Sequence, residues 1–251
     1  MALGDSYSSG EGIPNAVNGS MDQCQRSTNA YPFVAAAAVK PPAPAPTLLA
    51  CTGATVRNQA GTDKFAQAQL NKILPDAKFD VITMSFGGND VDFAGALIQC
   101  LAGAGGYVAA VGAGALIPGA IGVGPGFCLL DENAKKADIA ALRDDLVALY
   151  KTTTVYLSPG GRAYVVGYPH MFAPTNTWSV LARSTTCSGV QVGDAEKINR
   201  LIDAMNNMIE QAVKDAGSSV TFVPITDIYA GHELCGTADD WINSFPTLDS
   251  N

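Results

Sequence analysis

Short apolar segments alternate with helical segments along the whole sequence, and this alternation constrains the fold more than any other feature. Five segments have the composition and flanking turn residues of buried strands: Ala2–Leu3, Thr47–Cys51, Phe79–Phe86, Arg162–Pro169 and Ser219–Ile225. Helical patterns cover residues 30–39, 65–74, 132–150 and 194–217. Strands that alternate with helices favour a parallel sheet with both faces covered. We therefore predict an α/β fold with a central, mostly parallel, five-stranded sheet.

The size and charge of the chain limit its organisation and its partners. It has 251 residues, of which 47% are hydrophobic and only 15% charged, so it can bury a substantial core. No linker or internal repeat interrupts it, which predicts a single domain over 1–251 and, in our interpretation, a monomer. The net charge of -8 argues against nucleic acid or anionic lipid bound by charge, because both require basic patches.

Six cysteines are spread along the chain without any C-x-x-C pair, and only two histidines are present. This pattern argues against a zinc site and favours three disulfides formed in an oxidising compartment. Sequential pairing closes loops of moderate length. We therefore expect the bonds Cys24–Cys51, Cys100–Cys128 and Cys187–Cys235, among the 15 connectivities that six cysteines allow.

The predicted location is extracellular. Met1 abuts the first strand directly, with no basic or apolar leader region, so we interpret the sequence as a mature chain from which a signal peptide was removed. A cytosolic protein is the alternative, and the cysteine count weighs against it.

Residues 93–130 contain no charged side chain and are rich in glycine and alanine. Glycines and two prolines interrupt this stretch, so we expect no stable membrane span. Our interpretation is an apolar insertion near the site that lines a pocket for acyl chains. A loosely helical segment that packs on the core explains the composition equally well.

Four polar or turn-forming residues each follow a predicted strand: Ser6, Gly53, Asn89 and His232. The carboxyl ends of parallel strands meet at one edge of a sheet, where ligands of such folds bind. Ser6 alone would suit an ordinary helix cap, and Asn89 an ordinary turn. Their predicted convergence at one edge favours a functional site.

The residue types at this edge suit acyl transfer. A serine nucleophile requires a base, for which His232 and His170 are the two imidazoles available. The oxyanion of a tetrahedral intermediate requires hydrogen-bond donors, and the main-chain N–H groups of Ser6 and Gly53 and the Asn89 side-chain amide are candidates. This chemistry needs neither a metal nor an organic cofactor, and we expect none.

These residues resemble the four blocks of the SGNH (GDSL) hydrolase family: Gly4-Asp5-Ser6, a lone Gly53, Gly87-Gly88-Asn89-Asp90 and a C-terminal histidine. The motifs appear in order over nearly the whole chain. The longer forms, Ala-Leu-Gly-Asp-Ser-Tyr-Ser-Ser-Gly-Glu-Gly and Ala-Gly-His-Glu-Leu-Cys, together with the six cysteines, resemble the secreted actinobacterial esterase/lipase branch. The resemblance implies a flavodoxin-like three-layer sandwich and metal-free ester hydrolysis. It also implies Ser6 as nucleophile, His232 as base, and Ser6, Gly53 and Asn89 as the oxyanion hole.

One position departs from the family pattern. The family often has an aspartate three residues before the histidine, and this chain has Tyr229 there. The resembling branch can use a main-chain carbonyl at this position instead, so we expect the Tyr229 carbonyl to orient His232. Asp227, two residues earlier, is the alternative.

The leading hypothesis is a secreted serine esterase or lipase that acts on small-molecule or lipid esters. A carbohydrate O-acetyl esterase and a phospholipase are alternatives on the same fold. A non-catalytic binding module is a further reading, but Ser6, Asn89 and His232 are all present.

Overall fold

The computed structural model describes residues 1–14, 23–57, 64–96, 130–178, 190–236 and 240–242. The chain forms two compact units. Unit 1 comprises Met1–Val91, Asp138–Gly167 and Met205–Pro224, and unit 2 comprises Asp92–Ala137, Tyr168–Ala204 and Ile225–Asn251. The expectation of a single domain stays a prediction.

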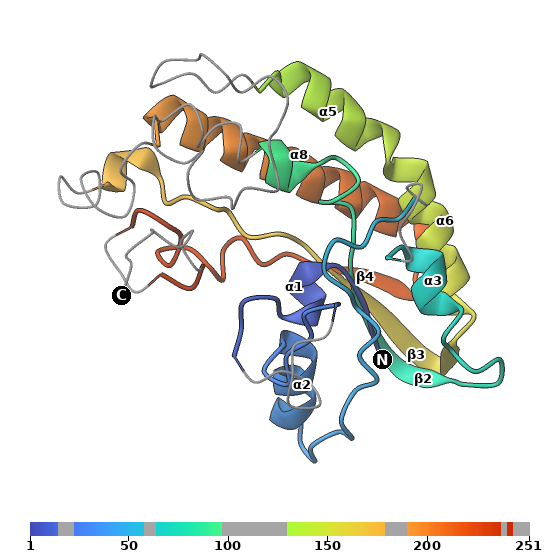
Figure 1. The fold of residues 1–251 in the computed structure, drawn as a ribbon. Coiled ribbons are helices and arrows are strands. Elements are labelled where there is room, and N and C mark those ends of the chain that lie inside the picture. Colours follow the sequence, from blue (N-terminus) through green and yellow to red (C-terminus); the bar gives the residue numbers. More distant parts are fainter. Residues whose placement is uncertain (15–22, 58–63, 97–129, 179–189, 237–239, 243–251) are drawn as a thin grey trace. The chain divides into compact units, whose positions relative to one another are not determined.

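Unit 1 contains a four-stranded parallel sheet in the order β1-β2-β3-β4, whose strands are β1 (Ala2–Gly4), β2 (Phe79–Ser85), β3 (Leu157–Val166) and β4 (Val220–Val223) (Figure 1). The register aligns Leu3 with Met84 and Met84 with Val165. All three side chains are fully buried, so this row of apolar residues forms the centre of the core. The predicted α/β class and parallel sheet are confirmed.

The prediction of five strands is wrong by one among the described residues, and the exception is Thr47–Cys51. This segment pairs with β1 through the bonds from Ala2 N to Thr47 O (2.9 Å), Leu49 N to Ala2 O (2.8 Å) and Cys51 N to Gly4 O (2.9 Å). Regular pairing would next have Gly4 donate to a carbonyl of this segment. The Gly4 N–H instead donates to the buried Gln69 side chain at 2.9 Å, so the ladder ends after a single bridge between Ala2 and Leu48.

The Thr47–Cys51 segment nevertheless occupies the outer edge of β1. When the five predicted strands are numbered along the sequence, Thr47–Cys51 is the second. Their spatial order is then 2-1-3-4-5, which is the flavodoxin-like order. In such sheets the strand order reverses beside the first strand, and ligands bind outside the carboxyl ends at that point. Here the reversal lies at β1, whose carboxyl end leads into Ser6.

The helices whose bounds lie within the described residues are α1 (Ser6–Ser9), α2 (Tyr31–Ala38), α3 (Ala66–Leu70), α5 (Glu132–Ala141), α6 (Arg143–Thr154) and α8 (Val192–Ala216), and residues 93–96 are helical as well. A short 3-10 turn, η3 (Thr175–Thr177), lies in unit 2. In unit 1, α1 packs on β1 and β2, α3 on β1 and α6 on β3. The predicted helix over 132–150 is divided into α5 and α6 at Leu142.

Helix α8 is the longest of the described helices and follows the predicted amphipathic pattern. Its predicted apolar face is buried at every position: Ile198, Leu201, Ile202, Met205, Met208 and Ile209. Gly217 follows its last residue with a φ of +112°, as a helix-ending glycine does. The first part of α8 belongs to unit 2 and the part from Met205 to unit 1.

Of the expected disulfides, Cys24–Cys51 is confirmed. Cys235 is also disulfide-bonded, while its expected partner Cys187 lies outside the described residues. Cys100, Cys128 and residues 97–129 of the uncharged stretch lie outside them too. Among the described residues, none of the helices has the length and apolar composition that a membrane span requires.

Candidate active site

The loop that carries Ser6 is fixed by the carboxylate of Asp5. Asp5 is buried (2% exposed) and caps α1, because its Oδ1 accepts the N–H of Tyr7 at 3.1 Å. The same oxygen accepts the Ser85 hydroxyl at 2.8 Å. Gly4 has a φ of +135°, and a Cβ there would lie 2.5 Å from the Ser85 carbonyl oxygen. The chain therefore turns sharply after β1 and leaves Ser6 half-buried at the start of α1.

Buried hydroxyl groups extend this network below the loop. The Ser8 hydroxyl lies 2.8 Å from that of Ser85 and 3.1 Å from the Tyr31 hydroxyl. Burial raises the pKa of Tyr31, so its hydroxyl stays protonated and can donate. Because every member has a partner, the network can hold α1 in one orientation without an unpaired buried polar group.

Gly53 lies in the turn after Cys51, with a φ of +74°. A Cβ at this position would meet no heavy atom within 4 Å, so the backbone conformation rather than crowding favours glycine. The turn is anchored by the Cys24–Cys51 disulfide and by the bond from Thr52 N to Cys24 O at 3.1 Å. Its main-chain N–H is thus held in a fixed turn with open space on the side-chain side.

Asn89 connects the loop after β2 to the Gly53 turn. Its Nδ2 donates to the Ala54 carbonyl at 2.9 Å. An amide nitrogen carries two hydrogens, so this contact orients the group and leaves a second N–H for another acceptor. The neighbouring Asp90 carboxylate accepts the main-chain N–H groups of Val56 (2.8 Å) and Arg57 (3.0 Å).

Opposing effects act on the pKa of Asp90. Burial raises its pKa, while the two main-chain N–H donors and the Arg57 charge act to lower it. The sequence indicated Asp90 only as part of a turn motif, whereas the fold shows that its carboxylate connects two loops.

Ser6, Gly53 and Asn89 all lie in unit 1, in loops tied together at the carboxyl ends of β1 and β2.

His232 lies in unit 2, in a loop held by several bonds. Leu234 donates to the Met171 carbonyl at 3.0 Å and accepts the N–H of Ala173 at 2.8 Å. The Glu233 carboxylate, only 3% exposed, accepts the N–H of Gly231 at 2.7 Å. These contacts flank the histidine on both sides, so its main chain is well fixed.

The turn before the histidine bears on how its ring is oriented. The Tyr229 carbonyl accepts the main-chain N–H of His232 at 2.8 Å, and the Asp227 side chain is exposed. A carbonyl oxygen has two lone pairs, so this bond is compatible with a second one to the ring. Orientation of the ring by Tyr229 stays a prediction.

Trp241 is a neighbour of His232 that sequence reasoning missed. Its indole stacks on the imidazole with ring centroids 3.8 Å apart and an interplanar angle of 8°. The two residues lie nine positions apart in the sequence and neither belongs to a predicted helix or strand, so periodicity carries no signal for this contact.

His170, the other imidazole considered as a base, also lies in unit 2. Its Nε2 lies 2.7 Å from Oδ1 of Asp203 on α8. The Asp203 side chain is 52% exposed, as expected for a surface contact.

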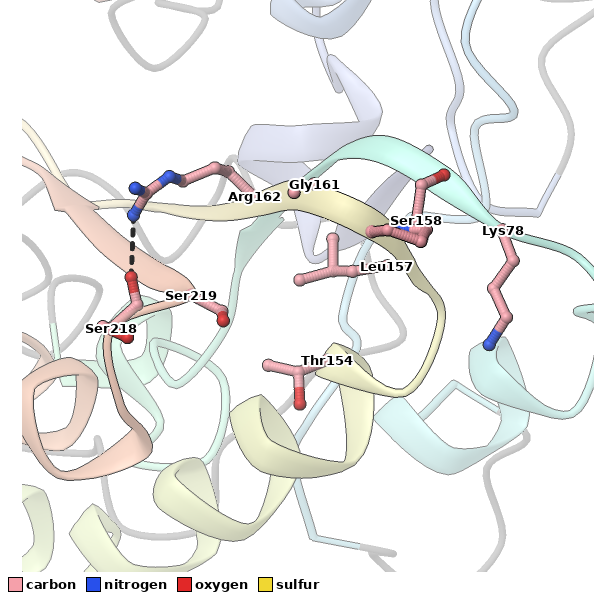
Figure 2. A pocket seen from close by; sticks show the side chains of 10 residues that line it. Lys78, Thr154, Leu157, Ser158, Gly161, Arg162, Ser218 and Ser219 are labelled. Carbon is pink, nitrogen blue, oxygen red and sulfur yellow. Dashed lines mark hydrogen bonds between the residues drawn. The ribbon is translucent and has the colours of Figure 1, made fainter.

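A polar pocket of about 550 Å³ lies in unit 1 (Figure 2), lined by Lys78, Thr154, Leu157, Ser158, Pro159, Gly160, Gly161, Arg162, Ser218 and Ser219. These residues precede or begin β2, β3 and β4, so the pocket lies at the amino-terminal edge of the sheet. Arg162 donates to the Ser218 carbonyl at 2.7 Å, and Lys78 to the Val155 carbonyl at 2.6 Å. The pocket is therefore remote from Ser6, at the opposite ends of the strands.

Metal ligands are not gathered in the part of the chain that the structure describes. No group of three or more His, Cys, Asp or Glu side chains there is arranged to hold a metal ion.

Comparison with known proteins connects these residues to a family. The family model described as the GDSL-like Lipase/Acylhydrolase family matches residues 2–245. Lipase 1 of Streptomyces coelicolor is 28% identical over 250 residues, which cover 99% of this chain and 77% of that protein. A lipase of Streptomyces rimosus is 27% identical over 245 residues, which cover 97% of this chain and 75% of that protein.

Two solved structures share the fold. An extracellular lipase from Streptomyces rimosus matches 97% of this chain and 86% of its own, with a TM-score of 0.65 and 25% identity. Phospholipase A1 from Streptomyces albidoflavus matches 100% of this chain and 88% of its own, with a TM-score of 0.66. At 24% identity the second likeness concerns the fold alone.

Proposed function

Because the chain belongs to the GDSL-like lipase/acylhydrolase family and is a carboxylic ester hydrolase, we propose that it cleaves acyl esters through a covalent acyl-enzyme on Ser6. His232 acts as the general base. The observation that carries the proposal is the pair of bonds that tie the three loops together: Cys51 N to Gly4 O (2.9 Å) and Asn89 Nδ2 to Ala54 O (2.9 Å).

The proposed reaction has two halves. In the first, the Ser6 hydroxyl oxygen attacks the ester carbonyl carbon while His232 takes the hydroxyl proton. The tetrahedral intermediate collapses, His232 returns the proton to the departing alcohol oxygen, and the acyl group stays on Ser6. In the second, His232 takes a proton from water, the hydroxide attacks the acyl-enzyme, and the carboxylic acid leaves.

The oxyanion that forms in each half requires donors that are already in place. The Ser6 and Gly53 main-chain N–H groups and the Asn89 side-chain amide are the proposed donors. The contacts to Gly4, Ala54 and the Cys24–Cys51 disulfide support this assignment, because they fix the loops before substrate arrives.

The Ser6→Ala variant tests the proposal. We expect hydrolysis of a short-chain nitrophenyl ester to fall by about 10³-fold or more, with an unchanged circular dichroism spectrum and melting temperature. His232→Ala is the companion variant, and His170→Ala is its matched control, which should keep its activity. A folded Ser6→Ala enzyme with full activity would refute the assignment.

Lipid esters are the proposed substrates, since proteins named as lipases match this chain over nearly its whole length. A phospholipase and a carbohydrate O-acetyl esterase remain the alternatives. Rates on esters from acetate to palmitate, on a phospholipid and on acetylated xylan separate these substrate classes. A non-catalytic binding module would hydrolyse none of them.

We also propose that the protein works outside the cell as a monomer. The Cys24–Cys51 disulfide and the even number of cysteines support export. Mass spectrometry after alkylation without reductant would detect no free thiol in this case, and sedimentation would report a single chain.

A further inference from the structure

The imidazole of His232 is covered on one face by the indole of Trp241. The centroid separation of 3.8 Å and the interplanar angle of 8° describe a parallel stack. The main chains of the two residues are also joined, because Trp241 N donates to His232 O at 2.8 Å. Tyr229 packs its ring edge-on against the indole, with centroids 5.7 Å apart and planes at 79°.

This arrangement restricts rotation of the imidazole. The indole contacts one flat face of the ring, whereas both nitrogens lie at the ring edge. A general base must aim one nitrogen lone pair at the proton it abstracts. The negative face of the indole also favours the imidazolium cation that exists once the proton has been taken.

A purely structural role in the core does not explain the contact of Trp241 with His232. Trp241 is 53% exposed, whereas Trp178, the other tryptophan, is 6% exposed and donates its Nε1–H to the Ala173 carbonyl. A tryptophan that serves only the core normally buries most of its large apolar surface. Trp241 leaves more than half of its surface in solvent and contacts the rings of His232 and Tyr229.

We propose that Trp241 is a positioning residue for the reaction, and that its indole holds the His232 ring in the orientation needed for proton transfer. The inference rests on the proposed role of His232 as the base. It assigns a function to a residue that lies outside the four family motifs.

Kinetics of Trp241→Leu and Trp241→Phe on a soluble short-chain nitrophenyl ester test the proposal. We expect Trp241→Leu to lower kcat by about 10- to 100-fold, with KM changed by less than about 2-fold, because a misplaced base slows the reaction without weakening substrate binding. Phe restores a flat aromatic face, so Trp241→Phe should recover kcat to within about 5-fold of the wild type. Ile228→Ala is the matched control, since Ile228 is a 59% exposed apolar residue of the same loop.

Proton NMR of the imidazole supplies a readout that is independent of turnover. The chain has two histidines, so a His170→Asn variant assigns the His232 ring protons. We expect these protons to be shifted upfield by the indole, and the shift to disappear in Trp241→Leu but not in Ile228→Ala.

Three outcomes distinguish a failure of the positioning role of Trp241 from a failure of the proposed function. Wild-type kcat in a folded Trp241→Leu enzyme, with His232→Ala inactive, overturns the positioning role and leaves the proposed function intact. A KM increase with constant kcat, shared by Ile228→Ala, also overturns it, because both residues would then contact substrate. Full activity of His232→Ala overturns the proposed function itself.

Discussion

At the scale of single residues, two groups are candidates for the hydrogen-bond acceptor that orients the His232 ring: the Tyr229 carbonyl and the Asp227 carboxylate. The carbonyl is already bonded to the main-chain N–H of His232 at 2.8 Å, so it lies at the turn itself. The Asp227 side chain is exposed to solvent, where a charge contributes little to holding a ring. We therefore favour the carbonyl, and with it a Ser–His dyad.

Replacement of Asp227 by Asn distinguishes the two. We expect kcat to stay within about 3-fold of the wild type, because the carbonyl does not depend on the side chain. A true carboxylate partner would give a fall of about 10³-fold or more. Asp203→Asn is the matched control, since Asp203 contacts the other histidine, His170, at 2.7 Å. A large loss in Asp203→Asn alone would identify His170 as the base instead.

At the scale of elements, one side chain from α3 determines where pairing along β1 stops. The buried Gln69 accepts the Gly4 N–H with Oε1 (2.9 Å) and donates to the Gly4 carbonyl with Nε2 (2.7 Å). Both bonds are made to the residue just before Asp5 and Ser6. Gln69 thus links helix α3 to the start of the nucleophile loop.

The Gln69→Leu variant should destabilise the protein by about 1–3 kcal/mol, because it leaves the buried Gly4 N–H without an acceptor. The urea midpoint should fall with little change in slope. Gln67 lies on the exposed side of the same helix, where its Nε2 contacts Asn71 at 2.8 Å. Gln67→Leu should therefore stay within about 0.5 kcal/mol of the wild type. Equal effects of the two variants would contradict the role given to Gln69.

Helices α5 and α8 are joined within unit 2 by Glu132. Its Oε2 lies 2.8 Å from Nη2 of Arg200, and its Oε1 lies 2.7 Å from Nζ of Lys136. Hydrogen bonds from Arg200 and then from Lys136 lower the pKa of Glu132 to about 2. A carboxyl group whose folded pKa is lowered stabilises the fold above its ordinary pKa, and the effect is lost as pH falls through the folded value.

Glu132→Gln should therefore melt about 1–3 °C below the wild type near neutral pH, as expected for a partly exposed ion pair at the surface. The difference should shrink between pH 4.5, the ordinary pKa of a glutamate, and about 2. Differential scanning calorimetry over this range measures it. Glu210→Gln removes an exposed pair within α8 (with Lys214, 2.9 Å) and serves as control. A difference that persists unchanged at pH 2 would contradict the assignment.

At the scale of the whole molecule, the sequence predicted what depends on local pattern. The parallel sheet, the buried face of α8 and the loops of Ser6, Gly53 and Asn89 follow from periodicity and from turn residues after strands. Gln69, Glu233 and Trp241 were not predictable in this way, because their contacts join residues that no repeat relates. The same reason explains the missing fifth strand, since a side chain from another element replaces its next hydrogen bond.

We expect the Cys24–Cys51 disulfide to support both the stability and the activity of the protein. Its two cysteines are separated by 27 positions, a loop for which the entropy of closure predicts about 3–4 kcal/mol of stabilisation. It also anchors the turn of Gly53, since Thr52 N donates to Cys24 O at 3.1 Å and Cys51 N to Gly4 O at 2.9 Å. We therefore expect a Cys24→Ser/Cys51→Ser double variant to lose stability and kcat together.

Urea unfolding and ester kinetics on the same preparation measure the two effects. Because the loosened turn carries a proposed oxyanion donor, kcat of the folded fraction should fall while KM changes little. The single variants are less informative, since each leaves a reactive thiol. A double variant with an unchanged midpoint would show that the loop is held by other contacts. One that lost stability but kept kcat would show that Gly53 is positioned without the disulfide, by the Asn89 bond to Ala54.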